Sequence, residues 1–141
     1  MGAGENPTVE VPALMCRAGH GIEGDRFFDY KPDYKGQITF FSWEIFRAAR
    51  EEFSVPSLSP GAFRRNVVIE GIDLNLLIGC RFSIGHAEFE GTVESKPCYW
   101  MEQAVAPGAE VWLRGNGGLR AKIRRDGRLA AGPADFRLLE P

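Results

Sequence analysis

The chain has 141 residues, of which 44% are hydrophobic and 26% are charged, close to the composition of an average globular domain. Its 17 Lys and Arg residues against 19 Asp and Glu residues give a net charge of −2, which excludes long-range attraction to nucleic acid or to an anionic membrane. No apolar stretch approaches the roughly 20 residues of a membrane-spanning helix, and the first residues lack a signal-peptide pattern. We therefore expect one domain over residues 1–141, in the cytoplasm, with neither nucleic acid nor membrane as a partner.

Glycine and proline divide the first half of the chain into short segments. β-Branched and aromatic residues predict strands over residues 8–14, 36–41 and 67–69. Ser42 is a suitable N-cap for a helix over residues 43–53, because its apolar residues recur at helical spacing. Ser59-Pro60 predicts a short helix over residues 61–64.

The second half of the chain shows the same density of turns. It predicts strands over residues 81–85 and 87–93, helical turns over 99–104, and a strand over 119–123 followed by an Asp126-Gly127 hairpin. Many short strands with a single well-patterned helix favour a barrel or a sandwich. The fold class is therefore mainly β, with more residues in strands than in helices.

The chain has three cysteines, Cys16, Cys80 and Cys98, and two histidines, His20 and His86. No two cysteines form a CxxC pair, so neither a disulfide framework nor a structural zinc site is expected.

Cys98 lies in the most specific segment, Lys96-Pro97-Cys98-Tyr99-Trp100. Pro97 can end a strand and present the next side chain at a corner. If a short helix opens at Tyr99, its N-terminus and a nearby cation would favour the thiolate. Such a thiolate would be a nucleophile, a sulfur carrier or a soft metal ligand. The alternative is a cysteine that packs as a small hydrophobic residue, which is the interpretation favoured for Cys16 and Cys80.

Three further segments could contribute to a site. Asp25 and Arg26 follow a glycine-rich loop that can approach a ligand closely, although such a pair is often a structural salt bridge. Arg64-Arg65-Asn66 offers two guanidiniums and an amide for an oxyanion, or else one arginine faces solvent and the other caps a helix. The glycine-rich stretch up to Arg120 is either an anion-binding nest or a plain hairpin loop.

The order of these segments resembles the MOSC family, named for the C-terminal domain of molybdenum-cofactor sulfurases. The matching stretches are GIEGDRFF (21–28), FRRNVVIEGIDLNLLIGCRFSIG (63–85), KPCYWME (96–102) and GGLRAKI (117–123). With the spacing between them, the resemblance runs from about residue 14 to residue 132.

The resemblance implies a β-barrel of MOSC type with a few short helices, and a role with the molybdenum cofactor (Mo-pterin). It implies that Cys98 is the catalytic sulfur acceptor or the thiolate that meets molybdenum. Arg65, Asn66 and Arg120 would then bind the phosphate and the pterin, and Asp25 and Arg26 would shape the loop over the site. The pyridoxal-phosphate domain that generates sulfur in the sulfurases has no counterpart in this sequence, so a sulfur donor or redox partner protein is expected.

Three functions remain open from the sequence. The first is a domain that binds the molybdenum cofactor, carries sulfur through Cys98, or does both. The second is an adaptor that binds a partner and performs no chemistry. The third is a small molybdenum-dependent reductase component that detoxifies N-hydroxylated compounds. The first and third require that Arg65, Asn66, Cys98 and Arg120 converge on one pocket bordered by the Asp25 loop.

Overall fold

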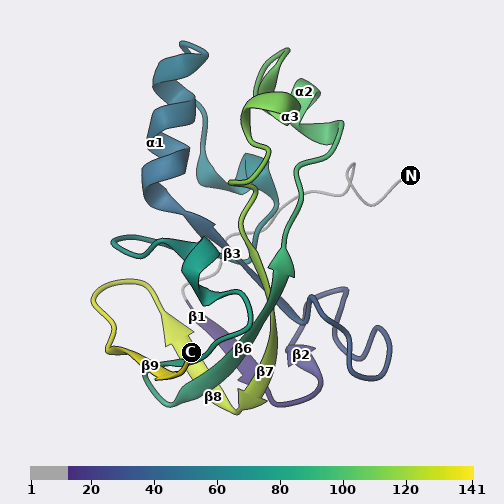
Figure 1. Ribbon diagram of the computed structural model, residues 1–141. Helices are drawn as coiled ribbons and strands as arrows, with labels where there is room; N and C mark the ends of the chain where they lie inside the picture. The colour runs from purple at the N-terminus through teal and green to yellow at the C-terminus, as the bar shows by residue number, and fades with distance from the viewer. Residues whose placement is uncertain (1–12) are drawn as a thin grey trace.

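The fold is known from a computed structural model, which describes residues 13–141 (Figure 1). The strands are β1 (Ala13–Arg17), β2 (Gly21–Ile22), β3 (Ile38–Ser42), β4 (Val67–Ile69), β5 (Arg81–Ile84), β6 (Ala87–Glu94), β7 (Leu119–Arg125), β8 (Gly127–Ala130) and β9 (Phe136–Glu140). The helices are α1 (Trp43–Glu52), α2 (Trp100–Ala104) and α3 (Ala109–Trp112), with the 3₁₀ turns η2 (Pro60–Phe63) and η3 (Leu74–Leu77).

The strands form two sheets that curl into a half-barrel, so the predicted mainly β class is confirmed. The larger sheet has the order β4-β3-β7-β6-β5-β9, and the smaller sheet has the order β2-β1-β8. β3 and β4 are parallel, whereas the other strand pairs are antiparallel. The hairpin at Asp126 links the two sheets, because β7 belongs to one and β8 to the other.

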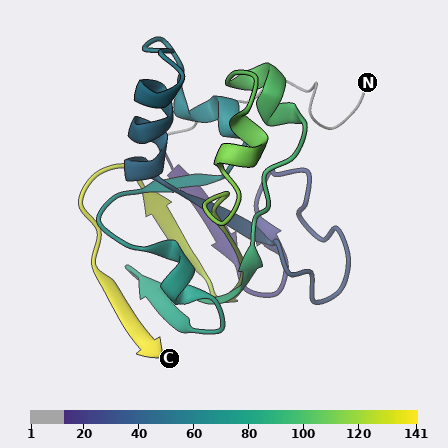
Figure 2. The same ribbon diagram turned by 45° about the horizontal axis from the view of Figure 1, so that its top comes forward.

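Two hydrophobic cores divide the molecule into a barrel part and a helical part. The barrel core contains Ile38, Phe40, Phe82, Phe89 and Ile123, among other buried side chains. The helical core contains Phe41, Phe46, Phe63, Met101 and Leu113. Phe40 and Phe41 are neighbours on β3 and enter different cores, so β3 joins the two parts. Figure 2 shows α1 on one side of the helical part and α2 with α3 on the other.

The sequence-predicted elements occur where they were expected. Ser42 caps α1 by accepting a hydrogen bond from the amide of Ile45 at 3.2 Å, and α1 is the longest helix among the described residues. β4 has its predicted bounds, and the Gly85-His86 turn joins β5 to β6. Of the strand predicted over 8–14, residues 8–12 lie outside the described residues, and 13 and 14 belong to β1, which extends to Arg17.

The structure adds elements that the sequence did not predict, namely β2, η3, α3 and β9. β9 has an irregular burial pattern, with Leu138 and Leu139 exposed, and therefore lacks the alternation that marks a strand. None of the helices in residues 13–141 is long and apolar enough to span a membrane.

The helical core makes a testable contribution to stability. Phe63 is fully buried, and its ring stacks on Phe41 with 4.4 Å between centroids. Phe63→Ala should lower the free energy of unfolding by about 3–5 kcal/mol, because it removes buried apolar surface and leaves a cavity. Leu76→Ala is the control, since Leu76 is 72% exposed and should change stability by less than about 0.5 kcal/mol. Urea denaturation measures both; equal effects would contradict the assignment of Phe63 to a packed core.

Candidate functional site

Cys98 lies in the segment that leaves β6 and enters α2, and its side chain is exposed. The carbonyl of Cys98 accepts a hydrogen bond from the amide of Met101 at 2.9 Å. α2 begins at Trp100 and has five residues, so the helix predicted to open at Tyr99 starts one residue later and is short. The electrostatic setting of the thiol therefore depends mainly on its cationic neighbours.

Arg65 forms hydrogen bonds to the backbone of the segment that carries Cys98. Its Nη2 donates to the carbonyl of Ser95 at 2.9 Å and approaches that of Lys96 at 3.4 Å. Its Nε donates to the carbonyl of Gly117 at 2.9 Å, and its Nη1 to that of Phe63 at 3.0 Å. One guanidinium thus holds together the ends of η2, β6 and the loop before β7.

The charge of Arg65 is coupled to the predicted site residues. Burial lowers the pKa of Arg65 to about 10, because a guanidinium away from water is less stable in its charged form. Negative charge at Cys98 opposes this fall in the pKa of Arg65, the positive charge of Arg120 adds to it, and the negative charge of Glu94 also opposes it. Cys98 and Arg120 therefore both lie within electrostatic reach of Arg65.

Arg120 and Asn66 meet around Thr39. Thr39 and Arg120 are direct partners across β3 and β7, so their side chains share one face of the sheet. The side-chain oxygen of Asn66 accepts from the amide of Thr39 at 2.8 Å and from its hydroxyl at 3.0 Å. The Asn66 oxygen therefore fixes β4 against β3.

Arg64 and Trp100 connect the site to the helical part. Arg64 ends η2 in the left-handed conformation, with φ of 57°. Its guanidinium lies over the Trp100 ring, 4.5 Å from the centroid, within the range of a cation–π interaction. The indole N–H of Trp100 donates to the carbonyl of Ala62 at 3.1 Å. These contacts hold the start of α2 against η2 and the residue that ends it.

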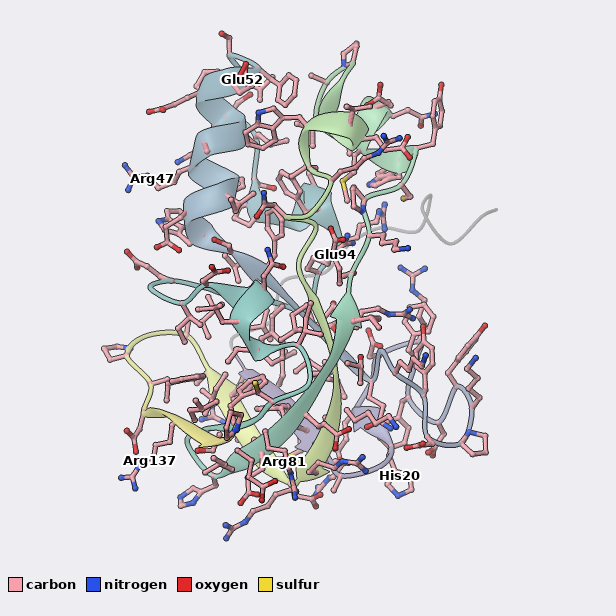
Figure 3. All side chains as sticks on the ribbon, viewed as in Figure 1. His20, Arg47, Glu52, Arg81, Glu94 and Arg137 are labelled. Atoms are coloured by element: carbon pink, nitrogen blue, oxygen red, sulfur yellow. The ribbon has the colours of Figure 1, made fainter. Side chains whose placement is uncertain are left out.

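Arg65 and Arg120 have no ion-pair partner among the residues that the structure describes. Within residues 13–141, no carboxylate lies at salt-bridge distance from Arg65 or Arg120. Glu94, labelled in Figure 3 between the helical part and the sheets, instead accepts from the amide of Gly117 at 3.1 Å. Arg65, whose charge acts on Cys98, and Arg120, whose charge acts on Arg65, are therefore not directly neutralised by a carboxylate of the described residues.

Among the described residues, the loop that contains Asp25 is connected to Arg120 through the residues that follow it, as far as Tyr34. Asp25 accepts from the amide of Phe27 at 3.0 Å, which closes a local turn, and the Arg26 guanidinium lies 5.5 Å from the Phe27 ring centroid. The Phe27 ring lies 5.8 Å from that of Tyr34, whose hydroxyl contacts Arg120. His20, next to this loop in the sequence, pairs with Asp29 at 2.6 Å and lies well away from Glu94 in Figure 3.

The glycine-rich loop before β7 is engaged by its neighbours. Gly117 uses its carbonyl for Arg65 and its amide for Glu94. A Cβ atom at Gly117 would lie 2.2 Å from the carbonyl oxygen of Ser95, so only glycine allows this approach. The structure therefore favours a packed loop over an open anion-binding nest.

A cleft of about 440 Å³ lies beside α1, and none of the predicted site residues lines it. Its lining comes from the end of β3 and the start of α1, from η3 and the segment before it, and from the loop before β7: Ser42, Glu44, Ile45, Gly71, Ile72, Asp73, Leu74, Asn75, Asn116 and Gly118. A Cβ atom at Gly118 would lie 3.5 Å from the Arg65 Nε, so the cleft and the Arg65 side chain meet at this residue. Among residues 13–141, no group of three His, Cys, Asp or Glu side chains could hold a metal ion.

The chain belongs to the MOSC domain family, whose model matches residues 23–137. No curated protein matches the chain closely enough to report.

Solved structures share the fold at 20–21% identity. The YuaD protein from Bacillus subtilis has a TM-score of 0.73 at 21% identity, over 89% of this chain and 84% of that one. YiiM from Escherichia coli has a TM-score of 0.72 at 20% identity, over 92% of this chain and 63% of that one. A protein described as hypothetical has a TM-score of 0.69 at 20% identity, with 92% and 61% covered. This chain therefore spans less than two thirds of the length of two of these three structures.

Tyr34, Gly36 and Thr39, which contact Arg120 or Asn66, were not predicted as site residues from the sequence. No motif marks them, because their partners lie about 27 to 86 residues away along the chain. The strand pattern over 36–41 alone could have placed Thr39 on the outer face of its strand.

The three cysteines should differ sharply in reactivity. Cys16 is fully buried, and burial, aided by the charge of Asp126, raises the pKa of its thiol to about 12. Cys80 is buried, and its thiol lies 3.3 Å from the Leu76 carbonyl. Iodoacetamide at neutral pH should therefore alkylate Cys98 at least about tenfold faster than the other two, because alkylation needs an accessible thiolate. Peptide mass spectrometry over time measures the three rates; faster labelling of Cys16 or Cys80 would contradict the site.

Proposed function

We propose that this chain binds the molybdenum cofactor at the exposed Cys98, with Arg120 holding an anionic group of the ligand. The observation that carries the proposal is Arg65, which lies within electrostatic reach of both Arg120 and Cys98. Neither Arg65 nor Arg120 has a carboxylate at ion-pair distance among the described residues. Two like charges repel, so an anion bound between them and the thiol would be favoured.

The residues present fit the chemistry of this cofactor. A thiolate is a soft ligand suited to a transition metal, and a guanidinium suits a phosphate. Membership of the MOSC family supports this ligand over other anions. When bound, the cofactor would supply the redox chemistry of molybdenum, which protein side chains lack.

The roles that we propose for the side chains of the site differ in part from those expected from the sequence. Arg65 directs its donors to backbone carbonyls, so it positions the Cys98 segment and adds positive charge. Arg120 is the guanidinium assigned to the ligand. Asn66 keeps its oxygen on Thr39 and is assigned its amide nitrogen as a donor. Asp25 and Arg26 keep their predicted role of shaping the loop that borders Arg120.

Cofactor content tests the proposal directly. Protein purified from a host that makes the cofactor should contain molybdenum and, after oxidation, a fluorescent pterin in similar molar amounts. Cys98→Ser and Arg120→Gln should each lower the molybdenum content at least about fivefold, because they remove the soft ligand and the anion-binding charge. Elemental analysis and pterin fluorescence are the measurements.

Arg124→Gln is the matched control for Arg120→Gln. Arg124 lies on the same face of β7, four residues along, and pairs with Glu90 at 2.9 Å. Its loss should leave the molybdenum content unchanged. A wild-type protein without molybdenum and pterin, or a Cys98→Ser variant that retains both, would refute the proposal.

The exposure of Cys98 also supports a second role, as a sulfur carrier in the cytoplasm, where thiols stay reduced. The Cys98 thiolate would attack the outer sulfur of a persulfide on a donor protein. The new S–S bond forms as the S–S bond of the donor breaks, and the donor leaves as a thiolate. No net oxidant is needed.

Mass spectrometry tests this second role. Incubation with a persulfide-loaded sulfurtransferase should add 32 Da to the peptide that contains Cys98, a gain that is reversed by dithiothreitol and absent in Cys98→Ser. The mass is that of one sulfur atom, about 32 Da for a thiol-to-persulfide conversion. Addition at Cys16 or Cys80 instead, or no addition at any cysteine, would argue against sulfur carrying.

A further inference from the structure

The segment before β3 packs on β6 and β7 through three successive residues. Asp33 pairs with Lys122 at 2.8 Å, and the hydroxyl of Tyr34 accepts from the Arg120 Nη2 at 2.6 Å. The carbonyl of Lys35 lies 2.8 Å from the hydroxyl of Thr92, which is also 2.9 Å from the carbonyl of Arg120. The segment is therefore fixed to β6 and β7 at the position of Arg120.

Gly36 provides the space that the Arg120 side chain occupies. A Cβ atom at Gly36 would lie 2.7 Å from the Arg120 Nε and 2.9 Å from its Nη2. These distances are shorter than real Cβ contacts, so any other residue would displace the guanidinium. Gly36 is itself buried, which leaves its backbone little room to move away.

Tyr34 holds the guanidinium from a second side. The Arg120 Cζ lies 5.2 Å from the centroid of the Tyr34 ring, in addition to the hydrogen bond to the hydroxyl. The rings of Tyr30 and Phe27, at 4.9 and 5.8 Å, pack against Tyr34 and hold it in place. A neutral hydroxyl and an aromatic ring attract a cation without cancelling its charge. Arg120 is thus held while its positive charge stays available.

We propose that Tyr34 and Gly36 are positioning residues, which fix the Arg120 guanidinium in one orientation and so set its contribution to the positive potential at Cys98 before a ligand binds. The inference rests on the proposed function in one respect, the membership of Arg120 in the Cys98 site. Without these contacts, repulsion from Arg65 and the rotamer freedom of a long side chain would move the guanidinium toward solvent. A preorganised charge binds an anion at a smaller entropic cost.

Two alkylating agents measure this potential at Cys98 itself. Iodoacetate carries a negative charge and iodoacetamide is neutral, but they have nearly the same size and react with the same thiolate. The rate constant of iodoacetate at Cys98 divided by that of iodoacetamide, normalised to the same ratio for glutathione, therefore reports the local charge. Changes in the accessibility or ionisation of the thiol alter both rates alike and cancel in the ratio. Peptide mass spectrometry at low ionic strength gives the rates.

The Arg120→Gln variant should lower the ratio about two- to fivefold, as expected for the loss of one nearby charge. Gly36→Ala should lower it by at least about twofold although every charge is retained, and Tyr34→Phe by less, since it keeps the ring. The double variant Gly36→Ala/Arg120→Gln should show the same fall in the ratio as Arg120→Gln alone, because Gly36 acts through Arg120. Arg124→Gln, with its ion pair to Glu90, should leave the ratio unchanged.

The possible outcomes separate this inference from the proposed function. If Arg120→Gln lowers the ratio while Gly36→Ala and Tyr34→Phe do not, the positioning role is wrong and the anion site stands. If Gly36→Ala changes both rates but not their ratio, its effect is on folding alone, and the inference is again wrong. If Arg120→Gln leaves the ratio unchanged, Arg120 does not act at Cys98, and both proposals fail. Thermal unfolding of each variant identifies a loss of fold.

Discussion

The hydrogen bonds of the Arg65 guanidinium to backbone carbonyls are the interaction on which this site depends. They join η2, the end of β6 and the loop before β7, because Arg65 contacts Phe63 two residues before it and Ser95 and Gly117, which follow it by 30 and 52 residues. Burial makes the charged form of Arg65 costly, so its pKa falls to about 10. The carbonyl oxygens compensate part of that cost, because they replace the water that the guanidinium loses. A positive charge is thereby fixed next to the only exposed cysteine of residues 13–141.

The candidate site is distinguished by arginine side chains that no carboxylate within residues 13–141 neutralises directly. Elsewhere on β7, Lys122 pairs with Asp33 and Arg124 with Glu90, as charged side chains on a sheet surface commonly do. Arg120, on the same face of the same strand, contacts a phenol instead. This difference along one strand supports the proposal that Arg120, unlike its paired neighbours, is a charge available to a ligand.

Much of the fold could be predicted from the sequence, because local signals determine it. Ser42 capping α1 and the uninterrupted apolar run of β4 are visible within a few residues. The prominence of Cys98 was visible too, through Pro97 and the family resemblance. The partners of Arg65 could not be predicted, because backbone carbonyls carry no sequence signal. For Gly36, the reason for glycine is the space taken by a side chain 84 positions away, not a turn conformation.

The central claim is that Cys98 and Arg120, and not the cleft beside α1, form the ligand site. Anomalous diffraction at the molybdenum absorption edge, from crystals of protein purified from a cofactor-producing host, tests it most directly. The account predicts one molybdenum peak at bonding distance from the Cys98 sulfur, with an anionic group of the ligand on the Arg120 guanidinium. A peak in the cleft lined by Ser42 and Asn116, remote from Cys98, would contradict it.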